Sequence, residues 1–95
     1  MKTLLKVLTK DMRPIIQGGK PNHIGKWYEC HDFDESDREC SRGFYGTQVD
    51  GLILYHKPKT GTRVFETLFD GKEKIFSPSK QRYSKQMLVK ELGRE

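Results

Sequence analysis

The side chains that most often bind transition metals are few in this chain and poorly spaced. The cysteines Cys30 and Cys40 are separated by a spacing that matches none of the paired-ligand motifs of zinc sites. Cys30 and the adjacent His31 would point to opposite sides of an extended segment. The sequence therefore predicts no metal site and no cofactor. The remaining histidines are His23 and His56.

The most concentrated chemistry lies in an acidic segment, residues 32–39, which carries five carboxylates in eight residues. Its aspartates lack the glycine and the distal glutamate that a calcium-binding loop requires. Because like charges repel each other, we expect the segment to be solvated or to meet a cationic group. It is a candidate surface for contact with another molecule.

Nucleophilic catalysis would need a pairing such as Cys40 or Ser41 with His31 or His56. Such combinations occur in any chain of this length, and their spacing here matches no known motif. The segment Gly43 to Gly46 encloses two aromatic residues but lacks the lysine and the spacing of a phosphate-binding loop. The sequence identifies no catalytic residue and favours a non-enzymatic protein.

Basic residues cluster in residues 57–63 and 72–83, with aromatic residues within or close to each stretch. This mixture is typical of nucleic-acid binding, in which lysine and arginine contact phosphates and an exposed ring stacks on a base for roughly 1–3 kcal/mol. The phenylalanines in these stretches are expected in the core, because a chain this poor in apolar residues needs them there. The rings left to stack on bases would be Tyr45, Tyr55 and Tyr83.

The candidate contact residues form two groups. The first is the acidic segment with two neighbours, comprising Asp32, Asp34, Glu35, Asp37, Arg42 and Tyr45. The second is a predicted basic face, comprising Lys57, Lys59, Arg63, Lys80, Arg82 and Lys85.

Length and charge fit one small soluble domain. The 95 residues are expected to form a single domain, 1–95, with a formal net charge of +5. Residues 1–56 carry eight basic and eight acidic side chains, so the whole excess lies in residues 57–95. A basic half favours nucleic acid, an acidic protein surface or an anionic ligand as partner. No apolar run is long enough to span a membrane, and we expect a cytoplasmic protein with no membrane partner.

Strands are predicted over residues 3–9, 26–30, 62–69 and 72–76, with a turn at Asp70-Gly71 between the last two. Residues 10–25 are rich in glycine and proline, which indicates a loop. Two segments have helical features. Thr47 can cap a short helix carrying Val49, Leu52, Ile53 and His56, although residues 52–55 can equally form a strand.

The second helix is expected to begin at Ser77-Pro78, a favoured start signal, and to run to about Leu92. The alternative is a short helix to Arg82 followed by a strand over residues 86–92. The predicted fold is therefore α+β: a small antiparallel sheet of about four strands with one or two helices on one face.

Several short stretches together resemble a family of small uncharacterised domains common in bacteriophages, some of which sit at the front of pentapeptide-repeat proteins. They are residues 6–11, Gly25-Lys26-Trp27-Tyr28-Glu29, Cys40-x-x-Gly43-Phe44, Arg63-Val64-Phe65-Glu66 and Lys90-Glu91-Leu92. Relatives often have histidine at the position of Tyr45. The resemblance implies a viral or prophage setting but no established activity.

Residues 43–47 are also similar to the Gly-aromatic-aromatic-x-Thr segment of ADP-ribosyltransferases. No histidine or arginine near the first predicted strand fits the cofactor site of those enzymes, and the chain is short for their fold. A nucleotide-binding pocket near this segment is therefore kept as a less favoured possibility for the function of the chain.

The sequence thus leads to two main expectations. The first is a small non-enzymatic binding protein, a phage-encoded regulator or inhibitor of a host protein or nucleoprotein such as a defence complex. The second is a direct nucleic-acid-binding protein that uses the basic C-terminal half. Convergence of the predicted basic residues on one face would favour the second.

Overall fold

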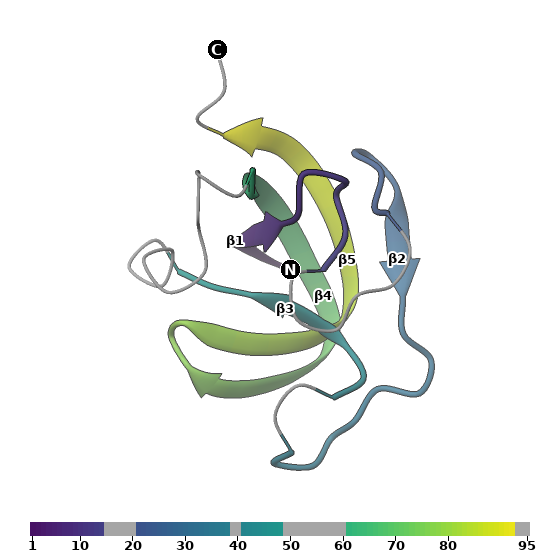
Figure 1. Cartoon of the computed structure of the whole chain (residues 1–95). Coiled ribbons are helices and arrows are strands. Elements are labelled where there is room, and N and C mark those ends of the chain that lie inside the picture. The colour runs from purple at the N-terminus through teal and green to yellow at the C-terminus, as the bar shows by residue number, and fades with distance from the viewer. Residues whose placement is uncertain (15–20, 39–40, 49–60, 93–95) are drawn as a thin grey trace.

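The computed structural model describes residues 1–14, 21–38, 41–48 and 61–92. These residues form one antiparallel sheet of five strands and contain no helix (Figure 1). The prediction of an α+β fold is therefore wrong, and this part of the chain is all-β. The strands are β1 (Lys2–Leu8), β2 (Trp27–Glu29), β3 (Phe44–Gly46), β4 (Arg63–Ser77) and β5 (Lys80–Leu92).

The first predicted strands are confirmed by β1, β2 and the first half of β4. Along β1, Leu4 and Leu8 lie on the face that points to the core, as the two-residue period of a strand predicts, and Val7 on the other face is buried as well. Phe65 and Phe69 in β4 follow the same two-residue period and are completely buried. Alternation of this kind explains why these elements were visible in the sequence.

The predicted turn at Asp70-Gly71 is wrong, because β4 continues through both residues to Ser77. The register between β4 and β5 shifts between Asp70 and Glu73, where β4 holds one extra residue. Gly71 has a φ of 81°, and the amide of Lys72 donates to Ser84 Oγ at 2.8 Å. The sequence signal of a turn therefore marks a bulge in a long strand.

The predicted helix beginning at Ser77-Pro78 is also wrong. Pro78 and Ser79 form the turn of the β4–β5 hairpin, and Ser77 pairs with Lys80 on either side of them. Proline favours the first central position of a turn as much as the first position of a helix. The residues after the turn form β5, which includes the strand over 86–92 that the alternative interpretation predicted.

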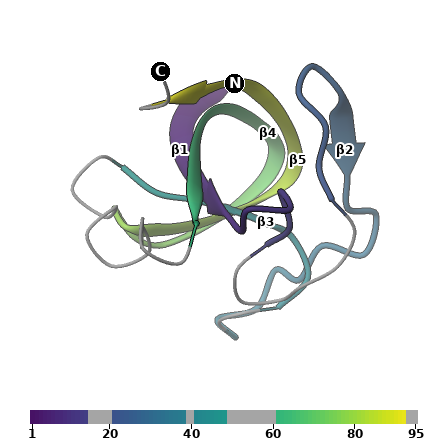
Figure 2. The same cartoon turned by 45° about the horizontal axis from the view of Figure 1, so that its top comes forward.

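The sheet closes on itself into a small ring. Its neighbours run β1–β4–β5, and β5 pairs on its other side with both β2 and β3. Directly after β3, Thr47 forms an antiparallel bridge with Leu5 of β1, with N···O distances of 2.9 and 2.8 Å. Figure 2 shows β1, β4 and β5 curving around a common centre.

Two small clusters fill this centre. Leu4, Phe69 and Tyr83 form one, with Phe44 packed against it. The other consists of three buried side chains, Leu8, Phe65 and Leu88, with Met12 beside them. Phe44 is thus partly buried at the edge of the core.

The helix predicted after Thr47 lies almost entirely outside the described residues, as do Val49, Leu52, Ile53 and His56. Thr47 itself is in the bridge to Leu5. Ile15 and Ile16 also lie outside. Within the described ranges, no helix is long and apolar enough to cross a membrane.

Candidate functional site

The candidate site is built around Arg82, whose side chain is completely buried although it carries a permanent charge. Four of its five N–H donors are used. Nη1 donates to the carbonyl of Arg38 at 2.6 Å and to the hydroxyl of Tyr45 at 3.0 Å. Nη2 donates to the carbonyls of Asp34 and Ser36 at 2.5 and 2.8 Å. A buried guanidinium is tolerable only with such partners.

Three aromatic rings complete the surroundings of this guanidinium. Its central carbon lies 5.5 Å from the ring centre of Phe33, 5.9 Å from that of Tyr45 and 5.0 Å from that of Phe76. These distances are within the range of cation–π attraction. The rings come from the connection after β2, from β3 and from β4, so Arg82 joins three separate parts of the chain.

Residues 32–38, which we call the acidic loop, wrap around Arg82 much as a metal-binding loop wraps around an ion. The carbonyls of alternate residues, Asp34, Ser36 and Arg38, converge on the guanidinium. The intervening carboxylates are consequently turned outward, with side-chain exposure of 69% for Glu35 and 90% for Asp37. The loop is therefore held from inside and presents acidic groups outside.

Hydrogen bonds within the loop fix it further. The carboxylate of Asp34 accepts from the amide of Ser36 at 2.8 Å, and the Asp34 amide donates to the carbonyl of Arg42 at 3.0 Å. Hydrogen bonds from Ser36 and Ser41 hold the pKa of Asp34 well below its usual range. Arg42 Nε donates to the carbonyl of Asp32 at 2.8 Å and lies 3.2 Å from its carboxylate. Arg42 thus ties the chain that follows the loop to the first residues of the loop.

The far half of the β4–β5 hairpin lies beside the acidic loop and is basic there. Lys72 Nζ lies 3.8 Å from Glu35, and Lys74 forms an ion pair with Asp37 that lowers the pKa of this carboxyl. Lys80 lies over the ring of Tyr45 at 5.7 Å. The acidic loop and these lysines form one mixed surface, in which exposed ion pairs are individually weak.

Gly43 is required for this arrangement. Its φ is 144°, and a Cβ at this position would lie 2.5 Å from Cγ of Arg82. Tyr45 is paired with Arg82 across β3 and β5 and so lies on the same face of the sheet. Its hydroxyl accepts from the amide of Ser41 at 2.7 Å and donates to the Ser41 carbonyl at 3.1 Å.

The structure brings together most residues of the first predicted group. Asp32, Asp34, Glu35 and Asp37 lie in the acidic loop, with Arg42 and Tyr45 beside it. Two members of the predicted basic face join them, since Lys80 lies over Tyr45 and Arg82 lies at the centre of the loop. Arg82 is an internal support rather than the exposed contact that the sequence suggested.

The rest of the predicted basic face does not gather at this site. Arg63 forms a two-point pair with Glu91 at the opposite end of the hairpin, which also raises the pKa of Arg63. Lys85 lies 3.9 Å from Glu29 of β2. Lys57 and Lys59 lie outside the described residues.

Sequence reasoning gave Phe33 no role, expected Phe76 in the core, and treated Lys72 and Lys74 only as basic residues that could contact phosphates. A usable signal existed for two of them, because Lys74 and Phe76 alternate along β4 on the face that also carries Arg82. The partners of Arg82 are backbone carbonyls 44 to 48 positions away. Backbone groups leave no trace in residue identity.

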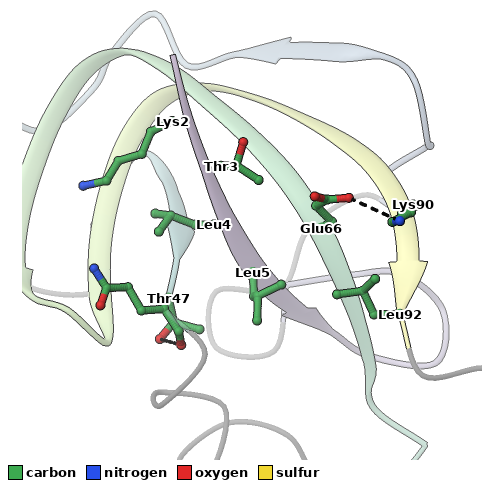
Figure 3. Close-up of a pocket in the computed structure, with 9 residues that line it drawn as sticks. Lys2, Thr3, Leu4, Leu5, Thr47, Glu66, Lys90 and Leu92 are labelled. Carbon is green, nitrogen blue, oxygen red and sulfur yellow. Dashed lines mark hydrogen bonds and ion pairs between the residues drawn. The ribbon is translucent and has the colours of Figure 1, made fainter.

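A shallow pocket of about 460 Å³ lies over β1 on another side of the ring. Figure 3 shows Lys2 and Thr47 on one side of β1 and the Glu66–Lys90 pair on the other. Lys2 Nζ donates to Gln81 Oε1 at 2.9 Å, and Lys90 lies 3.9 Å from Glu66. Both lysines among the described lining residues are thus engaged, so the pocket offers no ready phosphate site for a nucleotide.

Cys30 is a free thiol, and Cys40 lies outside the described residues. Burial and a hydrogen bond to Asp32 Oδ1 at 3.3 Å raise the pKa of the Cys30 thiol, so it is protonated and weakly nucleophilic. In the described ranges, no three His, Cys, Asp or Glu side chains lie close enough together to hold a metal ion.

No protein-family model, curated protein or solved structure is significantly similar to this chain.

Proposed function

We propose that this chain is a small non-enzymatic binding protein that contacts a partner protein through the acidic loop. The observation that carries the proposal is the buried guanidinium of Arg82, which holds the loop by three backbone carbonyls and so turns its carboxylates outward. A loop that is ordered before binding loses less conformational entropy on association than a flexible one does. An acidic segment that served only solubility would not need such an internal support.

The chemistry of the acidic loop defines the partner surface as basic. Glu35 and Asp37 are paired with Lys72 and Lys74 in exposed contacts, and such contacts contribute only about 0–1 kcal/mol each. Arginines or lysines of a partner can therefore replace these lysines at little cost. Ile75, at the same end of the hairpin, is also exposed, but it follows Lys74 along β4 and so points to the other face of the strand.

The biological setting we propose is a phage-encoded regulator or inhibitor of a host protein or nucleoprotein, such as a defence complex, acting in the host cytoplasm. Support comes from the small size of the domain, from the lack of a catalytic motif in the sequence and from the resemblance to small bacteriophage domains. A protein that acts by occupying a surface needs a rigid scaffold and a presented loop, and this chain has both.

Direct binding of nucleic acid receives less support from the geometry. Five basic side chains of the described C-terminal half lie in ion pairs: Arg63, Lys72, Lys74, Lys85 and Lys90. Phosphate binding depends on cations that gather on one face. Among the described residues these cations are spread over both ends of the hairpin and are compensated locally.

Affinity capture from a bacterial lysate tests the proposal. The wild-type chain is compared with Glu35→Gln/Asp37→Asn, and retained proteins are identified by mass spectrometry and by cross-linking to the bait. We expect at least one protein that is retained by the wild type and reduced at least tenfold by the variant. Cross-links should join it to the acidic loop or to the hairpin beside it.

A matched control is Glu29→Gln/Glu66→Gln, which removes the same charge from carboxylates that lie outside the acidic loop. This control should retain the partner as the wild type does. The proposal fails if no protein is enriched by the wild type, or if the two double variants lose the captured proteins equally.

A further inference from the structure

Lys6 is a buried amine inside the ring of strands. Its exposure is 6%, and it extends from the same face of β1 as Leu4 and Leu8. Nζ donates to the carbonyl of Tyr45 at 2.8 Å and lies 5.9 Å from the ring centre of Phe69. Burial lowers the pKa of Lys6 from 10.5 to about 7. Its proton is therefore exchanged within the physiological range rather than far above it.

The bond from Lys6 crosses the weakest junction of the ring. Between β1 and the segment that contains β3, the described residues form a single bridge, Leu5 with Thr47. The other junctions are full ladders, such as the seven paired positions between β1 and β4. We call the junction of Leu5, Lys6, Tyr45 and Thr47 the seam. Lys6 supplies a third hydrogen bond across it.

Tyr45 connects the seam to the acidic loop. Its carbonyl accepts the bond from Lys6, while its hydroxyl accepts from Arg82 Nη1 and contacts both backbone groups of Ser41. Arg82 in turn holds the carbonyls of the acidic loop. Tyr45 thus contacts the buried amine of Lys6 through its carbonyl, and through its hydroxyl it contacts Arg82, which supports the acidic loop.

We propose that Lys6 is a proton-operated latch: when its ammonium form is populated, the side chain leaves the interior, the seam opens, and the acidic loop loosens through Tyr45. This inference rests on the proposed function, because it assigns regulation to the same loop. Among the described residues, the partners of Lys6 are one carbonyl and one ring, and an ammonium held in this way gains much from reaching water. In the open state it is solvated, so protonation favours opening.

In the described part of the chain, few other titratable groups face Lys6. On β1, Lys2 is bound to Gln81, and on β5 the phenol of Tyr83 donates to the same Gln81 at 2.8 Å, while burial raises its pKa. On β4 the neighbours are Phe65, Thr67 and Phe69, which do not titrate, and Glu73 lies further along, facing Tyr83. The phenol of Tyr45 points to Arg82, away from Lys6.

Amide hydrogen exchange measured by NMR from about pH 6 to 9.5 tests the latch without any partner. Protection of the Leu5 and Thr47 amides should fall about tenfold per pH unit as the pH decreases from 9.5 to 7 and level off below. Protection of the Asp34 amide, which bonds to Arg42, should follow the same curve. In the same samples, the ¹³Cε resonance of Lys6 should titrate near pH 7.

Two variants separate the steps. Lys6→Met should make seam protection independent of pH, since nothing remains to titrate. Tyr45→Phe keeps the backbone carbonyl but removes the hydroxyl, so the seam should still titrate while Asp34 no longer follows it. Tyr83→Phe is a control that should leave both pH dependences unchanged.

The latch is overturned if the Lys6 resonance titrates near its ordinary value of 10.5. It is also overturned if wild-type seam protection does not change with pH. The ¹³C titration needs no substitution, so a variant that fails to fold does not leave the question open. Because no partner is present, failure of the latch is distinguishable from failure of the capture experiment.

Discussion

At the scale of single residues, Arg82 shows why a buried charge need not be a catalytic one. A guanidinium has a planar fork of donors, so it can hold several carbonyls at fixed angles, which a lysine ammonium on a flexible stem does not. Nε of Arg82 has no partner in the described part of the structure, so the arrangement is imperfect. The loss at Nε is outweighed by four hydrogen bonds to the acidic loop and to Tyr45.

Also at the scale of single residues, burial of Lys6 should make the stability of the protein depend on pH. Because its folded pKa of about 7 lies below the ordinary 10.5, the unfolded state binds more protons between these two pH values. The free energy of unfolding of the wild type should therefore rise with pH from about 7 to 10.5 and show no Lys6 contribution to the slope below 7. We expect Lys6→Met to stabilise the protein at pH 7 by about 2–4 kcal/mol.

Urea denaturation at a series of pH values measures this difference. The gap between wild type and Lys6→Met should narrow as the pH rises and be smallest near pH 10.5. Two results would show that burial of the Lys6 amine does not destabilise the folded protein. One is a difference in the free energy of unfolding that stays constant with pH, and the other is a variant less stable than the wild type at pH 7.

At the scale of elements, the β4–β5 hairpin determines what the rest of the chain can do. Its bulge near Gly71 changes which residues face the core: Phe69 and Tyr83 face inward on either side of it, and Arg82 and Lys74 then share the outer face. Without the one extra residue in β4, the far half of this strand would present its opposite face to the acidic loop.

Gly71 and Gly25 provide a matched test of this bulge, because both have a φ of 81°. A Cβ at Gly25 would meet nothing within 4 Å, whereas a Cβ at Gly71 would lie 2.1 Å from Ser84 Oγ. Gly25→Ala should therefore cost only backbone strain, about 1 kcal/mol, and Gly71→Ala about 2–4 kcal/mol. Thermal and urea unfolding measure both values. Equal losses for the two variants would contradict the crowding at the bulge.

Strands with an uninterrupted two-residue alternation were predictable, and those with shifted register were not. Residues 62–69 alternate regularly, so the first half of β4 was visible. In β5, four consecutive residues, 81–84, are buried, so both faces of the strand are covered there. Tyr83 and Leu88 therefore both reach core clusters although they lie five positions apart. The resulting spacing of apolar residues imitates a helix, and Ser77-Pro78 reinforced this interpretation.

The sequence showed which charged residues gather at the candidate site, but not how they are arranged in space. Five carboxylates in eight residues indicated a contact surface, and Arg42 and Tyr45 were correctly placed beside it. That Arg82 would be buried within the loop could not be foreseen, because its partners are carbonyls distant in sequence. Lys6 was hidden for a similar reason, since its position inside the ring depends on the seam.

At the scale of the whole molecule, the two halves of different charge fold onto each other. Lys72 and Lys74 belong to the basic half, yet they neutralise Glu35 and Asp37 of the first half. The formal net charge of +5 therefore does not describe the surface at the hairpin end, where opposite charges are interleaved. A partner that binds there meets a patterned surface, and matching of the pattern gives specificity and orientation more than raw affinity.

The measurement that tests the central claim most directly is the NMR order of the acidic loop in the wild type and in Arg82→Met. We predict amide order parameters near 0.85 for Glu35, Ser36 and Asp37 in the wild type, falling below about 0.6 in the variant while β1 and β4 stay rigid. A wild-type loop that is already flexible, or a loop equally rigid in the variant, would contradict the claim that a buried guanidinium builds this surface.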